Sequence, residues 1–341
     1  MNVAIVGATG AVGREMINCL YSEKFPFKTL SLFASSKSAG LEMDTPVGRF
    51  PVNEFSLDEI VENKCEIVFL AVSGDFSLQF SQTLVERGCI VIDNSSAFRY
   101  HDNVPLVVPE LNGHVLKSPG LRNIHGGMLI ANPNCTTAIL GMALFPLHEK
   151  FKAKKLICST YQAASGAGEP GMQELESAIR ARAFMDYKKF NPQVFSHNLC
   201  CNVIPCIDVI QNNDYTKEEM KMVWETRKIF NDDNIAISCT AVRVPTVRAH
   251  CIAATIEFSE PVSPEAVRSV LAASPGVVVV DDPRNKIYPV PSSASGKADV
   301  EVGRIRQSLI FGSHGIDMFV CGDQLLRGAA LNAVRIALQI V

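Results

Sequence analysis

Short β-rich runs alternate with helical stretches through the N-terminal half of the chain, and this alternation constrains the fold most. Helices are expected at Val12–Leu20 and at Phe76–Arg87, which is followed by Gly88 in the position of a C-cap. Strands that alternate with helices build an α/β, Rossmann-type doubly wound parallel sheet. The predicted strands are Val3–Val6, Leu30–Ala34, Ile67–Val72 and Ile90–Ile92.

The second half has longer strands and few helices between them, which predicts a second, α+β domain with a mixed or antiparallel sheet. One helix is expected over Thr216–Phe230, where Thr216 and Glu219 form a capping box, and another begins at Ser263 with Pro264 at its first position. The strands expected here are Lys155–Gln162, Ile235–Val244, Cys251–Phe258, Val300–Gln307 and Ile316–Cys321.

A chain of 341 residues exceeds what one hydrophobic core usually serves, so two domains are expected. The stretch Pro105–Asn134 is rich in Pro, Gly and Asn and is predicted to be loop. We therefore predict a first domain over residues 1–134 and a second, catalytic and dimerisation domain over 135–322. The apolar stretch 323–341 has helical spacing and is expected to return to the first domain.

Composition excludes several classes of partner. Net charge is −3 with scattered basic residues, which gives no footprint for nucleic acid or a membrane surface and favours small-molecule substrates. A strand is expected from residue 2, which leaves no room for a signal sequence, and no apolar run reaches membrane-spanning length. The 11 cysteines include no CxxC pair, so we expect free thiols, a cytoplasmic location and no metal site.

A glycine-rich loop follows the first predicted strand and opens the first helix. Glycines there let the backbone turn tightly and approach a pyrophosphate, which the helix N-terminus stabilises. The spacing is GxxGxxG rather than GxGxxG, so its position after the first strand strengthens the assignment, and a plain glycine-rich turn is the alternative. The predicted cofactor contacts in this loop are Gly7, Thr9, Gly10, Ala11, Val12 and Gly13.

The end of the second predicted strand bears on the choice of dinucleotide. An NAD enzyme places an acidic residue there, against the ribose 2′-hydroxyl. This chain instead has Ser35, Ser36, Lys37 and Ser38. Hydroxyls and a cation suit a 2′-phosphate, which favours NADP over NAD; a solvated loop is the alternative interpretation.

Cys135 stands out among the cysteines because it directly precedes an apolar helical run, Ala138–Leu147. A cysteine at a helix N-terminus has its thiolate stabilised by the helix dipole, which makes it a candidate nucleophile. A buried structural cysteine is the alternative.

Arg243 and His250 flank the connection between two predicted strands. They are seven positions apart, which would place them on opposite faces of one unbroken strand, but Pro245 interrupts it. Both side chains can then enter one cleft, where the arginine could grip a carboxylate and the histidine could move protons. Two surface residues at a sheet rim are the alternative.

Two further groups are candidates for anion binding. Arg99 follows the strand ending at Ile92, at the carboxyl edge of the sheet where ligands bind in this architecture. Lys221, Glu225 and Lys228 share a face of one predicted helix. A solvated ion-pair face is the usual meaning of such spacing.

Taken in order, these segments resemble aspartate-semialdehyde dehydrogenase of the bacterial type between residues 3 and 332. The chain departs from that pattern at Lys37, where an arginine is common, in the cysteines of HNLCCNVIPCID, and in DQLLRG, where DNLRKG is more frequent. The matching stretches are VAIVGATGAVG, DNSSAFR, NPNCTT, TYQAASGAG followed by GM-ELE, NVIP-ID, EE-KM--ETRKI, RVP----H and GDQLLRGAA-N.

The resemblance implies a role for each matching residue. It makes Cys135 the acyl-thioester nucleophile, His250 the acid/base and Gln162 the residue that orients the substrate beside the thiol. It also implies that Arg243 binds the substrate carboxylate and that Glu225 contacts the substrate amino group. Phosphate is assigned to Arg99, Asn134 and Lys228, and further NADP contacts to Ser165, Gly166 and Gln324.

The reaction implied is reversible, NADPH-dependent reduction of L-aspartyl 4-phosphate to L-aspartate 4-semialdehyde and phosphate by a homodimer. It belongs to the pathway to lysine and diaminopimelate, methionine and threonine. An N-acetylglutamyl-phosphate reductase is the nearest alternative, but its acylated substrate offers no ammonium to Glu225. A silent relative acting as a binding protein would have no reason to retain Cys135, Gln162, Arg243 and His250 together.

Overall fold

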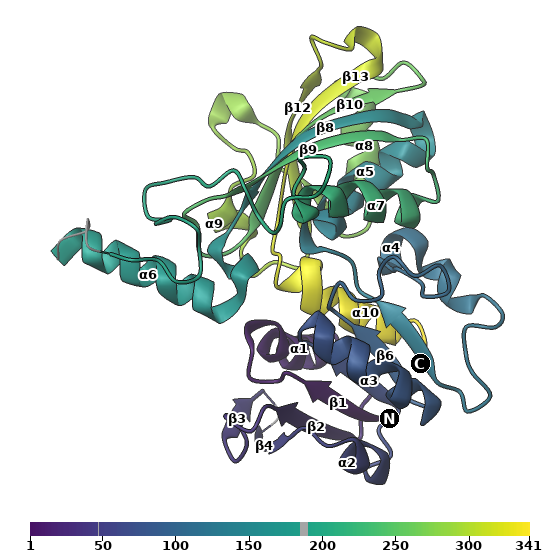
Figure 1. Ribbon diagram of the computed structural model, residues 1–341. Coiled ribbons are helices and arrows are strands. Elements are labelled where there is room, and N and C mark those ends of the chain that lie inside the picture. The colour runs from purple at the N-terminus through teal and green to yellow at the C-terminus, as the bar shows by residue number, and fades with distance from the viewer. Residues whose placement is uncertain (47, 185–189) are drawn as a thin grey trace. The chain divides into compact units, whose positions relative to one another are not determined.

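The computed structural model describes residues 1–46, 48–184 and 190–341, and these form two compact units (Figure 1). The N-terminal unit comprises Met1–Pro133 and Ala329–Val341, and the second unit comprises Asn134–Gly328. The first unit thus ends one residue before the predicted boundary. Residues 323–328, which we expected to return with the C-terminal helix, belong to the second unit.

The N-terminal unit is built on a seven-stranded sheet in the order β3-β4-β2-β1-β5-β6-β7. All neighbouring strands are parallel except β3 and β4, which are antiparallel. The predicted doubly wound α/β sheet is confirmed. Its strands are β1 (Asn2–Val6), β2 (Thr29–Ala34), β3 (Glu42–Thr45), β4 (Gly48–Glu54), β5 (Ile67–Leu70), β6 (Ile90–Asp93) and β7 (Met128–Ala131).

Helices cover both faces of this sheet because its central strands are apolar on both sides. In β1, alternate side chains point to opposite faces, and Ala4 and Val6 pack in a core with Ile60 of α2 and Leu84 of α3. The opposite face meets α1 and the returning α10. The helices are α1 (Ala11–Ser22), α2 (Leu57–Glu62), α3 (Gly74–Glu86), α4 (Pro109–Asn112) and α10 (Leu331–Leu338).

Parts of this unit differ from the sequence-based expectation. The stretch Pro105–Asn134 is not only loop, because it contains α4, a 3₁₀ turn (Gly113–Lys117) and the buried edge strand β7. The strands β3 and β4 were not expected either. Pro51 lies within β4, and proline is normally a sign against a strand.

The second unit contains a six-stranded mixed sheet in the order β11-β12-β13-β10-β8-β9. The pairs β8–β9 and β11–β12 are parallel and the others antiparallel, which confirms the predicted mixed sheet. Its strands are β8 (Ala153–Gln162), β9 (Ala236–Arg243), β10 (His250–Phe258), β11 (Val277–Val279), β12 (Val300–Gln307) and β13 (Gly315–Gly322).

Three helices, α5 (Cys135–Phe151), α7 (Lys217–Phe230) and α8 (Pro264–Ala272), contact the strands of this sheet. In Figure 1 they lie on the same face. Side chains along β8 alternate accordingly: Leu156 and Cys158 are buried, whereas Ile157 and Tyr161 are exposed on the other face. The capping box of Thr216 and Glu219 and the Ser263 cap are both present as predicted.

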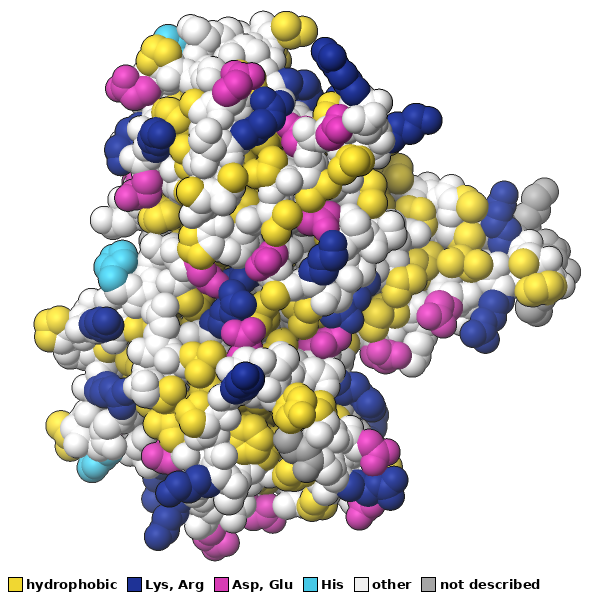
Figure 2. Space-filling view, turned by 180° about the vertical axis from the view of Figure 1, so that it is seen from behind, with side chains coloured by type: hydrophobic (Ala, Val, Ile, Leu, Met, Phe, Trp, Pro, Cys, Tyr) yellow, Lys and Arg dark blue, Asp and Glu magenta, His cyan; other side chains and the backbone are white. Residues whose placement is uncertain are grey.

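The long helix α6 (Gly168–Phe184) was not expected, and it extends away from the sheet of its own unit (Figure 1). Its opening residues, Gly168 to Gly171, include two glycines and a proline, which are typical of loops. Exposed apolar side chains on α6 include Ile179 and Phe184. The surface in Figure 2 intersperses acidic and basic side chains with such apolar ones.

No helix among the described residues is long and apolar enough to cross a membrane. The shorter helical segments of the second unit are two 3₁₀ turns (Ala164–Ala167 and Pro283–Asn285), α9 (Pro291–Ala294) and a further 3₁₀ turn (Gly312–His314). A π-helical segment, Leu326–Ala330, precedes α10.

Buried asparagines hold α10 in the N-terminal unit. The Asn332 side-chain amide donates to the Val107 carbonyl at 2.9 Å and to Asn132 Oδ1 at 2.6 Å. Asn132 in turn donates to Asn94 Oδ1 at 2.8 Å. Because Asn332 is fully buried, loss of its amide would leave acceptors without water to replace it.

Replacing Asn332 by Ala is therefore expected to lower the free energy of unfolding of the N-terminal unit by about 1–3 kcal/mol. Urea unfolding followed by circular dichroism measures this change. Asn103→Ala, at an exposed position of the same unit, is the matched control and should stay within about 0.5 kcal/mol of the parent chain. Equal stability of the two variants would show that the asparagine network does not hold the helix.

Candidate active site

Three polar residues meet at one edge of the second unit's sheet because of strand order. Gln162 ends β8, Arg243 ends β9 and His250 begins β10, and β8 lies between the other two strands. Gln162 is paired directly with Arg243, and the next residues along β8 and β10 pair as Tyr161 with Cys251. All three side chains are buried. Arg243 and His250 thus lie on separate strands with both side chains buried, so they are not the two surface residues of the alternative interpretation.

Cys135 is the first residue of α5, as predicted, and it is partly exposed. The preceding Asn134 is the N-cap, and its side-chain oxygen accepts the N–H groups of Thr136 and Thr137 at 3.0 and 3.2 Å. This cap fixes the helix start under the thiol. The positive end of the helix dipole stabilises a thiolate there.

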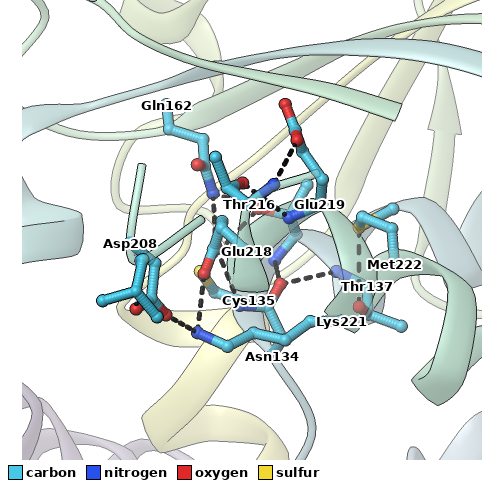
Figure 3. A network of polar contacts seen from close by, with 12 residues as sticks. Asn134, Cys135, Thr137, Gln162, Asp208, Thr216, Glu218, Glu219, Lys221 and Met222 are labelled. Atoms are coloured by element: carbon cyan, nitrogen blue, oxygen red, sulfur yellow. Dashed lines mark hydrogen bonds and ion pairs between the residues drawn. The ribbon is translucent and has the colours of Figure 1, made fainter. Parts of the chain in front are cut away.

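Glu218, in the first turn of α7, joins the helix start to the sheet edge (Figure 3). Its Oε1 accepts hydrogen bonds from Asn134 Nδ2 and from Gln162 Nε2, each at 2.9 Å. Its Oε2 binds Lys221 Nζ at 2.8 Å, and Lys221 also binds Asp208. Burial opposes ionisation of Glu218, but the charge and hydrogen bond of Lys221 prevail and lower its pKa to about 2.

Gln162 and His250 each present a buried polar atom that has no hydrogen-bond partner among the described residues. Gln162 Nε2 donates to Glu218 and to Thr136 Oγ1, whereas its Oε1 is unpaired. His250 Nδ1 accepts the Ala163 N–H at 3.0 Å, whereas its Nε2 is unpaired. Buried polar atoms are rarely left unsatisfied, so these two atoms are candidates for ligand contacts.

The His250 ring is neutral in this setting. Burial lowers its pKa, the neighbouring Arg243 charge lowers it further, and the result is a pKa of about 3. Because Nδ1 accepts a backbone N–H, the neutral ring must carry its proton on Nε2. The imidazole therefore offers a hydrogen-bond donor at its unpaired nitrogen.

The Arg243 guanidinium contacts a backbone carbonyl and an aromatic ring. Its Nη1 donates to the Ala163 carbonyl at 2.7 Å, and the Phe195 ring lies 5.8 Å from its central carbon. A methyl group built on Gly166 would overlap Nη1 and would lie 3.3 Å from His250 Nε2. Gly166 therefore sits beside both side chains, which leaves no room there for a larger residue.

Glu225 and Lys228 lie on α7, but their face is not the solvated one that their spacing usually indicates. Glu225 is fully buried, and its carboxylate accepts the Asn134 N–H at 2.5 Å. Lys228 is half-buried. Because α7 packs on α5 and β9, Glu225 faces the helix start that carries Cys135.

In the N-terminal unit, the glycine-rich loop forms a cradle. Gly7 has a positive φ of 85°, and a Cβ there would collide with the Ala71 carbonyl. The first turn of α1 has no side-chain cap, which leaves its N–H groups available to an anion. A hollow of about 350 Å³ adjoins the loop and is lined by Val6, Gly7, Thr9, Gly10, Ala34, Ser35, Phe55, Ala71, Val72, Ser73 and Phe76.

The remaining predicted residues have defined places within their own units. Lys37 is exposed in the turn after β2, with Ser35 and Ser36 also exposed. Arg99 is buried beyond the carboxyl end of β6 and donates to the Asn94 carbonyl at 2.9 Å. In the second unit, the Gln324 amide donates to Ser165 Oγ and accepts the Ala249 N–H at 2.8 Å.

Sequence reasoning missed two residues of the site. Glu218 lies two residues after the N-cap Thr216, and the capping box needs only Glu219, so the additional glutamate in this turn was the signal that sequence reasoning could have used. Gly328 lies against the nucleophile candidate, because a methyl group built on it would lie 2.5 Å from Cys135 Cβ. That approach joins residues far apart in the sequence, so no local pattern indicates it.

The chain matches two family models that together describe a two-domain enzyme. Residues 2–118 match the NAD binding domain of semialdehyde dehydrogenases, and residues 144–327 match their dimerisation domain. Fold and site thus define a semialdehyde dehydrogenase.

Individual relatives narrow the class. Aspartate-semialdehyde dehydrogenase of Campylobacter jejuni is 43% identical over 98% of this chain and 96% of its own length. A Vibrio cholerae aspartate semialdehyde dehydrogenase II structure, complexed with ASA, superposes with a TM-score of 0.91 at 36% identity, covering 99% of this chain and 97% of that one. A Candida albicans enzyme with NADP gives 0.75 at 25% identity, covering 99% and 98%. The chain belongs to the aspartate-semialdehyde dehydrogenase family.

The protonation state of His250 can be observed directly. We expect its ring to remain neutral, with the proton on Nε2, from pH 8 down to about pH 5, because its pKa is depressed to about 3. An unfolded chain would protonate this residue near pH 6.5, so its burial costs stability progressively as the pH falls from 6.5 towards 3. Two-dimensional NMR of ¹⁵N-labelled histidine rings, assigned by loss of one signal in His250→Asn, measures both properties. A titration midpoint near 6.5 would contradict the interpretation.

Proposed function

We propose that this protein catalyses the NADPH-dependent, reversible reduction of L-aspartyl 4-phosphate to L-aspartate 4-semialdehyde and phosphate through a thioester on Cys135. The observation that carries the proposal is the grouping within one unit of a thiol at a helix N-terminus with Gln162, His250 and Arg243. Family membership and the aspartate-semialdehyde dehydrogenase activity named for the relatives support it.

The substrate is proposed to be held at both ends. Arg243 binds the carboxylate, because one edge of its buried guanidinium is fixed by Ala163 and a planar guanidinium presents two parallel donors to a carboxylate. Glu225 is proposed to meet the amino group. Lys228 and the helix start at Asn134 are proposed to hold phosphate, and the assignment of Arg99 to phosphate stays a prediction. The Asn134 side chain already makes three hydrogen bonds, so it acts by fixing that helix start.

Covalent catalysis then divides the reaction into two easier steps. The Cys135 thiolate attacks the acyl carbon of aspartyl phosphate, the C–O bond to phosphate breaks, and inorganic phosphate leaves with the electron pair. Gln162 Oε1 and His250 Nε2–H are proposed to contact the substrate beside the thiol. The His250 donor stabilises negative charge on the carbonyl oxygen and is the acid/base position at which a proton is held or moved.

The residues present fit a phosphorylated dinucleotide. The Gly7 cradle that a Cβ would fill and the uncapped α1 terminus suit a pyrophosphate, and Lys37 with Ser35, Ser36 and Ser38 suits a 2′-phosphate. When bound, NADPH supplies the hydride that reduces the thioester carbon to the aldehyde level. The assignments of Ser165, Gly166 and Gln324 to the same cofactor stay predictions.

We also propose a homodimer formed on the open face of the six-stranded sheet. Ile157 and Tyr161 are large side chains on this face of β8, and they are 48% and 39% exposed. The match to a dimerisation domain over this unit supports the same assignment.

Replacing Cys135 by Ala is expected to abolish phosphate-dependent turnover of aspartate semialdehyde in both directions, because the covalent step needs the thiol. NADPH binding should be unchanged. Absorbance assays measure the first effect and fluorescence titration the second. The control is Cys206→Ala at an exposed position, which should keep normal activity. Activity of the Cys135 variant near that of the control would exclude the thioester mechanism. If the parent chain were active only on N-acetylglutamate semialdehyde, aspartate semialdehyde would be excluded as its substrate.

Replacing Lys37 by Asp is expected to shift the cofactor preference towards NAD, because a carboxylate repels a 2′-phosphate and accepts a ribose hydroxyl. The ratio of kcat/KM for NADP to that for NAD should fall by about 10-fold or more, since removing a charge-assisted hydrogen bond is worth about 1.5–3 kcal/mol. Lys64→Asp, at an exposed position of the same unit, is the control. An unchanged ratio would show that Lys37 does not contact the 2′-phosphate of the cofactor.

A further inference from the structure

The loop that follows α6 is fastened to that helix through one carboxylate. Glu174 accepts the N–H groups of three successive residues: Gln193 and Val194 at 2.6 Å each on Oε2, and Phe195 at 3.1 Å on Oε1. Hydrogen bonds to an ionised acceptor are the stronger kind. Glu174 is half-buried and thus partly shielded from competing water.

The last of these three residues contacts the candidate substrate site. The Phe195 ring lies 5.8 Å from the central carbon of the Arg243 guanidinium, within the range of a cation–π contact. The same ring packs against the buried cluster of Ala164, Leu175 and Leu199. A Cβ built on Gly171 would lie 3.1 Å from the ring, so the ring is closely confined.

We propose that Glu174 is a positioning residue for recognition of the substrate carboxylate, because it holds Phe195 against Arg243. The inference rests on the proposed function, in which Arg243 grips that carboxylate. The hydrogen bond from Nη1 to Ala163 fixes one edge of the guanidinium, and the ring limits its rotation. A guanidinium fixed in plane loses less conformational freedom when it binds a carboxylate through two parallel hydrogen bonds.

Without the three hydrogen bonds, the backbone of Gln193 and Val194 would no longer be held to α6, because both residues are exposed, and Phe195 would keep only the packing of its ring. Phe195 would then move from the guanidinium, and Arg243 would adopt several orientations in the unliganded site. This added freedom of Arg243 would lower the affinity for the substrate. The thiol, His250 and the cofactor loop make none of the contacts that Glu174 makes, so turnover at saturation and cofactor affinity should change much less.

The test uses the full-length protein and the variant Glu174→Gln, in which one oxygen is replaced by an amide that cannot accept a hydrogen bond. KM for aspartate semialdehyde should rise by about 5- to 30-fold, the range expected for a buried cation–π contact. The kcat value and the KM values for NADP and phosphate should change by less than about twofold. Phe195→Leu should produce the same split, and the two changes together should cost no more than the larger one alone, because they act through one contact.

Glu176→Gln is the matched control on the same helix, since its carboxylate only approaches Arg180 at the surface, at 3.9 Å. Its kinetics should equal those of the parent chain. Unchanged semialdehyde KM in Glu174→Gln or in Phe195→Leu would overturn the inference, as would an equal loss in every kinetic constant. If Glu174→Gln does not fold by thermal melt, Phe195→Leu and its KM split decide the question. A parent chain inactive on aspartate semialdehyde would instead refute the proposed function.

Discussion

The shared carboxylate of Glu218 links the two structural elements on which the site depends. It accepts a hydrogen bond from Asn134, the N-cap residue of α5, and another from Gln162, at the end of strand β8. A buried carboxylate is tolerable only with full compensation, and Lys221 provides the opposite charge. Removing one partner of such a buried pair typically costs about 3–5 kcal/mol. The position of Cys135 relative to Gln162 therefore depends on a carboxylate that is not among the residues proposed to carry out the reaction.

Strand order explains why residues distant in sequence converge. With β8 between β9 and β10, two carboxyl ends and one amino end meet at one edge, and these ends carry Gln162, Arg243 and His250. Register then matters, because a slip of one residue moves every side chain to the opposite face. A paired register of eight residues between β8 and β9 fixes Gln162 beside Arg243.

The sequence predicted best where a local pattern has one structural outcome. Apolar runs separated by helices identified β1, β2, β5 and β6, and the capping box located the start of α7. Sequence-based prediction failed where an element is stabilised by residues far away in the sequence. The four-residue strand β7 lies within a stretch rich in Pro, Gly and Asn, and its backbone is paired with the distant strand β6. The proximity of Gly328 to Cys135 likewise depends on tertiary contacts that no spacing records.

The burial of cysteines has a consequence for covalent inhibitors and chemical probes. Eight of the eleven thiols are buried, Cys135 is partly exposed, and Cys201 and Cys206 are exposed. Desolvation raises the pKa of buried Cys65 and Cys89, so those thiols are poorly nucleophilic. An electrophile therefore chooses among three sulfurs rather than eleven. Accessibility alone favours Cys201 and Cys206, so selectivity for Cys135 has to come from thiolate stabilisation at its helix N-terminus and from groups that bind Arg243.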